Sequence, residues 1–203
     1  MKLYHSPASP FVRKVCVLLH ELEQTDQVAL EPVTTTALSS ADILIASNPL
    51  GKIPALERDD GPTLYDSRVI CAYLDHRFGG GLYPDGPARW EVLTLEATGD
   101  GIMESGVSMT YETRLRPPTE QSPAWIEAQW AKAERAVAAL NRRWMGHLAG
   151  SLDMGHISVA CALAYLDFRH PQRDWRRGNT DLAAWFAGFE SRPAMQATVP
   201  PAA

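Results

Sequence analysis

A run of glycine and proline residues between residues 79 and 87 most constrains how this chain can fold. The run consists of Gly79, Gly80, Gly81, Pro84, Gly86 and Pro87. Glycine weakens helices and strands and proline removes a backbone donor, so the segment predicts a linker. Strand-like and helical segments alternate before it, whereas no convincing strand follows it. The sequence therefore predicts a first domain over residues 1–78, a linker over 79–86 and an all-helical domain over 87–203.

The first domain has the pattern of a mixed sheet with flanking helices. Strands are expected over residues 2–5, 28–33, 53–57 and 63–65, and helices over 10–22, 39–45 and 66–74. Because a helix joins the first two strands, these should be parallel. The turn Asp59-Asp60-Gly61-Pro62 has the length of a hairpin loop, so the last two strands should be antiparallel.

The second domain has a helical composition throughout. Helices are expected over residues 89–115, 122–148, 153–168 and 180–190, followed by an irregular tail over 192–201. Gly99, Gly101 and Gly106 weaken the prediction of the first of these helices. The third is nearly uncharged and bounded by capping residues, which predicts a central buried helix.

The charge balance argues against a nucleic acid or a membrane as partner. The chain has 19 Lys and Arg against 24 Asp and Glu, a formal net charge of −5, and its basic residues are scattered. No apolar stretch reaches the roughly 18 residues that span a bilayer. The N-terminus reaches Ser6-Pro7 too soon to hold the apolar region of a signal peptide. A cytoplasmic location is therefore expected.

The cysteines exclude two kinds of site. Cys16, Cys71 and Cys161 are odd in number and widely spaced, which argues against a disulfide framework. No Cys-x-x-Cys pair is present, so neither a zinc ribbon nor a dithiol redox motif is supported, and no metal is expected.

Four segments in this order resemble the cytosolic glutathione S-transferase family, and the resemblance runs over nearly the whole chain. The segments are Ser9-Pro10-Phe11-Val12-Arg13-Lys14, Asn48-Pro49-Leu50-Gly51-Lys52-Ile53-Pro54-Ala55-Leu56, Tyr65-Asp66-Ser67-Arg68-Val69-Ile70 and the tail from Arg192-Pro193-Ala194 to Pro200. The first resembles the catalytic segment of the serine-type bacterial, zeta and theta branches. The second resembles the family's cis-proline segment and the third its γ-glutamyl binding turn.

The resemblance implies a fold and an activity. The fold is an α/β thioredoxin-like N-terminal domain followed by an all-α C-terminal domain. Glutathione is the implied co-substrate, and its sulfur attacks a small hydrophobic electrophile in a conjugation, isomerisation or reduction used in detoxification. A homodimer is also implied. The electrophile itself and the dominant reaction stay open, because no specific motif is readable in the helical half.

Ser9 is the expected catalytic residue. A thiol with a pKa of about 8.5 is mostly protonated at neutral pH, and the thiolate is the nucleophile. A hydroxyl and a helix N-terminus both stabilise an anion. Ser9 supplies both, because Pro10 begins the helix. The alternative reading of Ser9 is an ordinary N-cap, and Ser6, a turn residue before Pro7, is the rival hydroxyl.

The expected glutathione contacts come from the two other motifs. A cis Ile53-Pro54 bond, implied by the resemblance, lets the main chain of Ile53 pair with the cysteinyl backbone of glutathione. The alternative is a trans proline at an edge strand. Ser67 and the N–H groups of its helix can hold the γ-glutamyl carboxylate, and Asp66 can accept from the ammonium group. The family more often has glutamate or glutamine at Asp66, and a plain capping pair is the alternative.

Two further residues complete the expected binding set. Lys52 can reach the glycyl carboxylate of glutathione as a point charge, or it is a solvated turn lysine. Phe11 is a candidate contact next to Ser9. Like Met103, Met109 and Tyr111, which can line an electrophile pocket, it also fits a core position.

Asp153 and His156 are expected to form a capping box at the start of the central buried helix. The family commonly has Ser/Thr-x-x-Asp there. A histidine can reach back to the N-cap only through a ring nitrogen, and its expected role is structural.

Two other functions remain as alternatives. A non-catalytic protein-interaction module with the same fold is the first, although Ser9, Pro54 and Asp66-Ser67 favour a working glutathione site. A thiol-disulfide reductase is disfavoured, because serine stands where such relatives carry cysteine.

Overall fold

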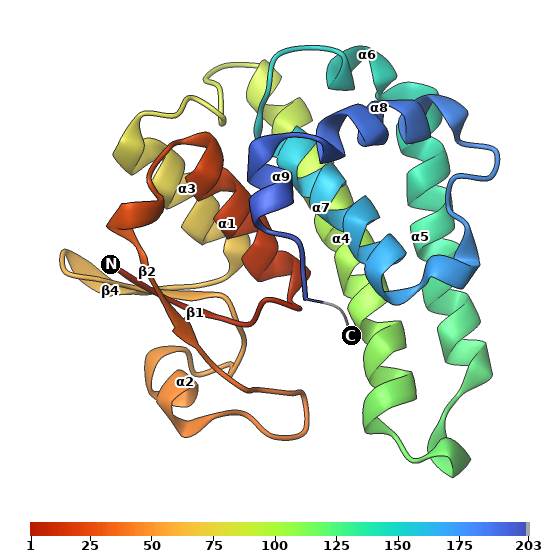
Figure 1. Ribbon diagram of the computed structural model, residues 1–203, viewed down its shortest axis with the longest axis horizontal. Coiled ribbons are helices and arrows are strands. Elements are labelled where there is room, and N and C mark those ends of the chain that lie inside the picture. The colour runs from red at the N-terminus through yellow and green to blue at the C-terminus, as the bar shows by residue number, and fades with distance from the viewer. Residues whose placement is uncertain (202–203) are drawn as a thin grey trace. The chain divides into compact units, whose positions relative to one another are not determined.

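The computed structural model describes residues 1–201, and the chain divides into two compact units. One comprises Met1–Arg89 together with residues 193–201, and the other comprises Trp90–Arg192. The N-terminal unit holds the sheet and the second unit is helical, which confirms the predicted fold class (Figure 1). The C-terminal segment, which the sequence places with the helical domain, belongs instead to the N-terminal unit.

The sheet of the N-terminal unit has four strands in the order β2-β1-β3-β4. These strands are β1 (Lys2–His5), β2 (Ala29–Pro32), β3 (Ala55–Arg58) and β4 (Gly61–Leu64). The pair β1 and β2 is parallel, whereas β1 with β3 and β3 with β4 are antiparallel. The predicted mixed sheet is therefore confirmed.

Helices cover both faces of this sheet. The helices α1 (Pro10–Glu21) and α3 (Ser67–Phe78) lie on one face, and α2 (Asp42–Ser47) lies on the other (Figure 1). Tyr4 and Ala55 pack with Leu44 of α2 in one buried cluster. Since neighbouring residues of a strand point to opposite faces, the fully buried Leu3 and Leu56 point toward α1 and α3.

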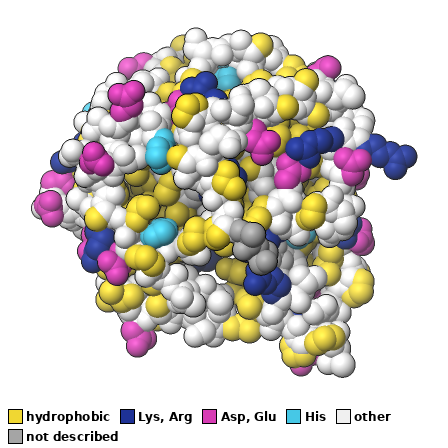
Figure 2. Space-filling view, viewed as in Figure 1, with side chains coloured by type: hydrophobic (Ala, Val, Ile, Leu, Met, Phe, Trp, Pro, Cys, Tyr) yellow, Lys and Arg dark blue, Asp and Glu magenta, His cyan; other side chains and the backbone are white. Residues whose placement is uncertain are grey.

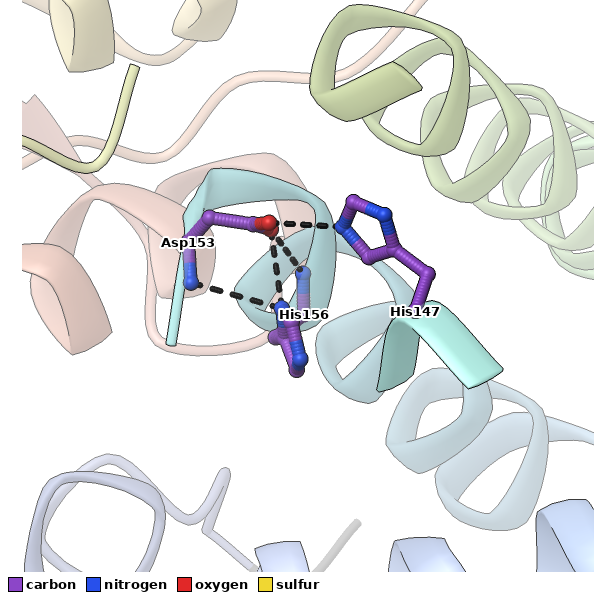
Figure 3. Close-up of side chains that lie close together, drawn as sticks. All are labelled: His147, Asp153 and His156. Atoms are coloured by element: carbon purple, nitrogen blue, oxygen red, sulfur yellow. Dashed lines mark hydrogen bonds and ion pairs between the residues drawn. The ribbon is translucent and has the colours of Figure 1, made fainter. Parts of the chain in front are cut away.

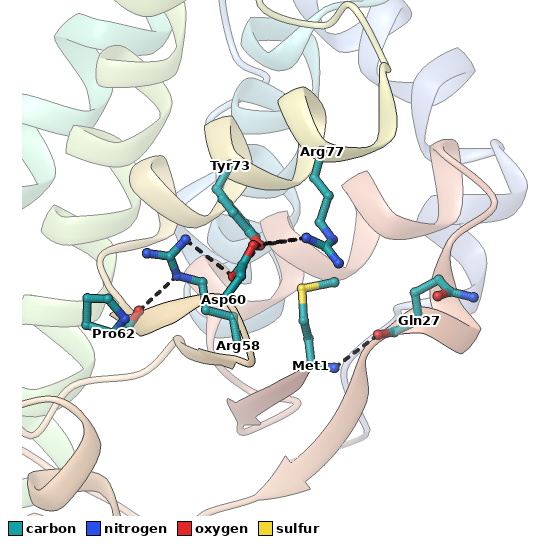
Figure 4. Close-up of polar contacts among 7 residues, drawn as sticks. All are labelled: Met1, Gln27, Arg58, Asp60, Pro62, Tyr73 and Arg77. Carbon is teal, nitrogen blue, oxygen red and sulfur yellow. Dashed lines mark hydrogen bonds and ion pairs between the residues drawn. The ribbon is translucent and has the colours of Figure 1, made fainter.

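A polar network attaches the β3–β4 hairpin to α3 (Figure 4). The Asp60 carboxylate accepts from the Tyr73 hydroxyl at 3.0 Å and from Arg77 Nη1 at 3.1 Å. The hydrogen bond from Tyr73 is the main cause that lowers the pKa of Asp60. The Arg58 guanidinium lies over the Tyr73 ring, 5.1 Å from its centroid, and donates to the Pro62 carbonyl at 2.9 Å. These contacts hold the hairpin beside the helix that begins at its end.

On the other side of the hairpin, Glu57 of β3 receives three polar contacts. It accepts from the Tyr4 hydroxyl at 2.5 Å and from Ser47 Oγ at 2.8 Å, and Lys2 Nζ lies 2.9 Å away. The hydrogen bonds from Tyr4 and Lys2 lower the pKa of Glu57 from 4.5 to about 2. The ionised carboxylate therefore joins β1, β3 and α2.

We expect this lowered pKa to appear in the acid sensitivity of the protein. The stabilisation by ionised Glu57 is complete above pH 4.5 and is lost as the pH falls toward about 2. Because the side chain is 36% exposed, we expect an effect of roughly 0.5–1 kcal/mol. Urea unfolding across this pH range should show a shallower loss of stability for Glu57→Gln than for the wild type. Equal losses in the two proteins would contradict the assignment.

The helical unit contains five α-helices and two short 3₁₀ helices within the described residues. The elements are α4 (Ala88–Leu115), η2 (Pro118–Glu120), α5 (Pro123–Arg143), α6 (Met145–Leu148), α7 (Met154–Arg169), η3 (Pro171–Arg173) and α8 (Thr180–Glu190). Residues 154–166 of α7 are all buried, which confirms the predicted central helix. The single helix expected over 122–148 is instead interrupted at Trp144, which separates α5 from α6.

The prediction of an irregular tail over residues 192–201 was partly wrong. The helix α9 (Pro193–Ala197) forms there and packs against α1. Arg13 of α1 donates from Nη2 to the Met195 carbonyl at 3.0 Å and from Nε to Thr198 Oγ1 at 3.3 Å. These donors satisfy an end of α9, which explains why a short proline-led segment is helical.

On the face drawn in Figure 2, Lys and Arg side chains are interspersed with Asp and Glu and form no continuous basic surface. Among residues 1–201, none of the helices has the length together with the apolar character needed to traverse a bilayer.

Candidate glutathione site

The register of the sheet brings the three predicted binding motifs to one end of it. Tyr4, near the end of β1, pairs with Ala55 at the start of β3. Leu64, the last residue of β4, pairs with Leu56. The chain after β1, the chain before β3 and the chain after β4 therefore meet at the same end of the sheet. These segments carry Ser9, Ile53-Pro54 and Asp66-Ser67, respectively.

Ser9 occupies the N-cap of α1, with Pro10 as the first helical residue. Its Oγ accepts from the Val12 amide at 3.4 Å, so the predicted cap is confirmed and the hydroxyl proton remains available for donation. Pro10 has no N–H, and the Phe11 amide belongs to the first helical turn, which lacks i−4 acceptors. Within residues 1–201, a hydroxyl and an amide without a backbone acceptor thus stand together at this helix start. Ser6 instead forms the preceding turn, where its carbonyl accepts from the Ser9 amide at 3.0 Å.

The Ile53-Pro54 bond is cis, as the resemblance implies. Ile53 is half-buried and packs against the cluster of Tyr4, Leu44 and Ala55, while Pro54 is buried. Lys52 is exposed in the turn before them. The structure therefore fixes Ile53 and Pro54 at the sheet end and leaves the Lys52 side chain in solvent.

Asn48 is a positioning residue that the sequence reasoning treated only as part of a turn. It is 1% exposed, donates from Nδ2 to the Lys52 carbonyl at 2.7 Å and accepts from the Leu50 amide at 3.0 Å. Gly51, within this turn, has a φ of +62°, a conformation that favours glycine. An asparagine before Pro-x-Gly could have indicated such a side-chain-closed turn. Asn48 therefore sets the path of the chain into Ile53-Pro54.

Asp66 and Ser67 begin α3, and the Tyr65–Asp66 bond is also cis. Asp66 caps the helix by accepting from the Arg68 amide at 3.0 Å, and it pairs with Arg68 Nη2 at 2.7 Å. Burial alone would raise the pKa of Asp66, but the hydrogen bond from Arg68 and the charge of Lys14 lower it overall. The carboxylate is thus held ionised at the helix start.

Ser67 is buried, whereas the neighbouring Asp66 is exposed. It is only 2% exposed, and among residues 1–201 its hydroxyl has no hydrogen-bond partner. The Oγ atom itself is not fully buried, so the hydroxyl can be reached from outside at the start of α3. The Ser67 hydroxyl is therefore suited to a ligand.

The candidate lining residues are spread over both units. Phe11 is half-buried in α1 of the N-terminal unit. In the helical unit, Met103 and Met109 are buried in the core and Tyr111 is 39% exposed. Met103 and Met109 therefore occupy core positions, the alternative to lining a pocket.

Two family models match this chain. The family described as "Glutathione S-transferase, N-terminal domain" matches residues 3–82, and "Glutathione S-transferase, C-terminal domain" matches residues 123–188. The GST-like protein YibF of Escherichia coli K12 is 30% identical over 211 residues that cover all of both chains. A solved glutathione transferase family member from Pseudomonas fluorescens Pf-5, with bound glutathione, is 50% identical over 98% of each chain, with a TM-score of 0.96. A second solved structure from that bacterium, with bound S-(propanoic acid)-glutathione, is 49% identical over 99% of this chain and 100% of that one, with a TM-score of 0.91.

Proposed function

Because this chain belongs to the glutathione S-transferase family, we propose that it binds glutathione and uses the sulfur to attack a small electrophile. The observation that carries this proposal is the convergence of Ser9, Ile53-Pro54 and Asp66-Ser67 at one end of the sheet. Two of these motifs begin helices, and helix N-termini favour anions. Glutathione presents anionic groups along its length, so the chemistry of the two matches. The Pseudomonas fluorescens relative that holds glutathione supports the same ligand.

Ser9 and the start of α1 would act on the sulfur. The hydroxyl donates to the thiolate while its Oγ still accepts from the Val12 amide. The Phe11 amide supplies a second donor of the first helical turn. Both interactions favour the anion over the thiol and so lower the pKa of the sulfur. The thiolate then attacks the electrophilic atom, forms the S–C bond and displaces a leaving group or opens a ring.

The remaining motifs would hold the peptide. The Ile53 main chain pairs with the cysteinyl N–H and C=O in the manner of an added strand. The Ser67 hydroxyl and the free amides of α3 receive the γ-glutamyl carboxylate, and Asp66 accepts from the ammonium group. The exposed Lys52 is free to reach the glycyl carboxylate. Each charged end of glutathione therefore has a partner of opposite character.

We expect Ser67→Ala to weaken glutathione binding by about 1–3 kcal/mol, because it removes a hydrogen bond to a buried carboxylate. Isothermal titration calorimetry measures the change. Ser67→Thr keeps a hydroxyl and should retain more affinity than Ser67→Ala. The exposed Ser151, replaced by alanine, is the matched control and should bind like the wild type. Wild-type affinity in Ser67→Ala would remove this residue from the site.

The proposed activity is tested by glutathione calorimetry followed by turnover of aryl halides, epoxides and peroxides. Saturable binding with turnover of at least one class is the expected result. Binding without turnover of any class would favour the non-catalytic interaction module. No binding would refute both the site and the enzyme. The proposed homodimer is tested by light scattering of the purified protein.

A further inference from the structure

A cluster of two histidines and one aspartate lies at the junction of α6 and α7, within the helical unit (Figure 3). His147 belongs to α6, Asp153 is the N-cap of α7 and His156 lies in its first turn. His147 Nε2 is 2.6 Å from Asp153 Oδ2, and His156 Nδ1 is 2.8 Å from Asp153 Oδ1. His156 is 3% exposed, and the other two side chains are 16% and 13% exposed. Both rings are directed to one largely buried carboxylate.

The predicted capping box is present here, but capping does not account for the cluster. Asp153 Oδ1 accepts from the His156 amide at 3.2 Å, and His156 Nδ1 lies 3.3 Å from the Asp153 amide. When Nδ1 accepts from that amide, its lone pair also faces Asp153 Oδ1 at 2.8 Å. At this distance either a proton on Nδ1 or a metal cation between the two atoms is needed to avoid repulsion of the lone pairs.

The other nitrogen of His156 adds to this mismatch. Within the described residues, His156 Nε2 is buried and has no hydrogen-bond partner. A buried nitrogen without a hydrogen-bond partner is unfavourable. Glutamate or glutamine at this position would complete the capping box and leave no such nitrogen. Histidine at this position therefore leaves a buried nitrogen that the capping box does not use.

His147 has a carboxylate beside its second ring nitrogen, as metal-bound histidines commonly do. Its other ring nitrogen, Nδ1, lies 3.3 Å from Glu91 Oε2. Metal-bound histidines commonly donate their second N–H to a carboxylate, which fixes the ring and its tautomer. Trp144 packs edge-on against His147, and Trp185 lies beside His156 with the ring centroids 6.2 Å apart. Aromatic rings therefore flank the cluster on both sides.

We propose that His147, Asp153 and His156 bind a zinc-like divalent transition-metal ion at the junction of α6 and α7. One ligand atom of each residue lies within 4.8 Å of the others. Bonds of about 2.0–2.2 Å to nitrogen and oxygen place two tetrahedral ligands of one ion roughly 3.3–3.6 Å apart. The two Asp153–histidine pairs, at 2.6 and 2.8 Å, would therefore open slightly, and ligand atoms as far as 4.8 Å apart would close by about 1–1.5 Å. The four-residue helix α6 carries His147 and would adjust when the ion binds.

The imidazole and carboxylate groups of the cluster indicate which metal ion it would bind. Imidazole nitrogen suits zinc, copper, nickel and iron, whereas magnesium and calcium prefer oxygen ligands. Two histidines and one carboxylate form a three-ligand set that leaves a position for water. The ion would connect α6 to the first turn of the central helix α7 and so stabilise the helical unit.

The test is zinc binding by the tag-free, chelator-treated full chain in the absence of glutathione. Calorimetry with ZnCl₂ should show one saturable site, and thermal melting should show a higher Tm with zinc than without it. Co²⁺ should give the intense visible bands of a four-coordinate site. His147→Gln leaves the capping box intact and should weaken zinc binding at least tenfold. The exposed His76 on α3, replaced by glutamine, is the matched control and should bind like the wild type.

Two results would overturn the metal site. One is the absence of saturable zinc binding by the wild type. The other is an equal zinc affinity of the wild type and His147→Gln, which would assign the ion to cysteines or surface histidines. Glutathione affinity measured on His147→Gln should equal that of the wild type, so the outcome is independent of the proposed transferase site.

Discussion

Replacing Ser9 by alanine is expected to lower kcat with glutathione by roughly 10- to 100-fold. This range corresponds to the loss of one hydrogen bond to a charged group, about 1.5–3 kcal/mol. The KM for glutathione should change little, because the carboxylates and main chain of the peptide keep their partners. The thiol of bound glutathione should ionise at higher pH, so the rise of kcat with pH should shift upward. Steady-state kinetics at saturating electrophile measure both effects.

Two companion variants separate catalysis from folding. Ser9 also caps α1, and loss of an N-cap to alanine costs about 1 kcal/mol of stability. Glycine is a better N-cap than alanine, so Ser9→Gly should lose turnover with little loss of stability. Ser6→Ala removes the rival hydroxyl and should retain turnover. A loss of turnover in Ser6→Ala together with normal turnover in Ser9→Ala would transfer the role to Ser6.

The second large effect is expected at Gly99 in α4. A Cβ atom placed there would lie 2.4 Å from Ser158 Oγ and 2.8 Å from the Ser158 carbonyl oxygen of α7. Ser158 itself donates to the Glu96 carbonyl at 3.1 Å, so the two helices approach closely at this point. Gly99→Ala must push the backbones apart, and we expect it to destabilise the protein by about 1–3 kcal/mol. Urea unfolding gives this value.

Gly101 provides the control on the same helix. A Cβ atom there would have no neighbour within 4 Å. Alanine is favoured over glycine in a helix by about 1 kcal/mol, so Gly101→Ala should stabilise the protein by up to that amount. Opposite signs at positions 99 and 101 are the expected result. Stabilisation by both substitutions would show that α4 and α7 do not pack closely at Gly99.

These glycines show what the sequence could and could not indicate. Gly99, Gly101 and Gly106 weakened the prediction of a helix that in fact runs unbroken from Ala88 to Leu115. Helix propensity is a local property, whereas the reason for Gly99 is the backbone of α7, more than 50 residues away. Sequence alone cannot distinguish a glycine required by packing from one that is merely tolerated.

Features that depend on residues close together in the sequence, such as helix caps, could be predicted. The N-caps Ser9 and Asp66 and the capping box of Asp153 and His156 were confirmed, because a cap and its partners lie within a few residues of one another. The order of strands and helices followed from the same local signals together with hydrophobic spacing. The cis Ile53-Pro54 bond came from the resemblance, not from the dipeptide.

Features that depend on distant contacts were missed. The helix α9 forms where Arg13, about 180 residues earlier, donates to the carbonyl of Met195. His147 approaches Asp153 only because the chain breaks at Trp144 and turns back toward α7. Each of these contacts is set by tertiary packing and leaves no periodic signal.

The most direct test of the proposed function is an ultraviolet absorbance titration of the thiol of glutathione bound to the protein. The free thiol has a pKa of about 8.5, and its thiolate absorbs more strongly than the protonated form. With Ser9 and the start of α1 at the sulfur, the bound thiol should ionise at clearly lower pH, and Ser9→Ala should shift that ionisation back upward. A titration of bound glutathione that coincides with that of free glutathione would contradict a sulfur held as an anion at this site.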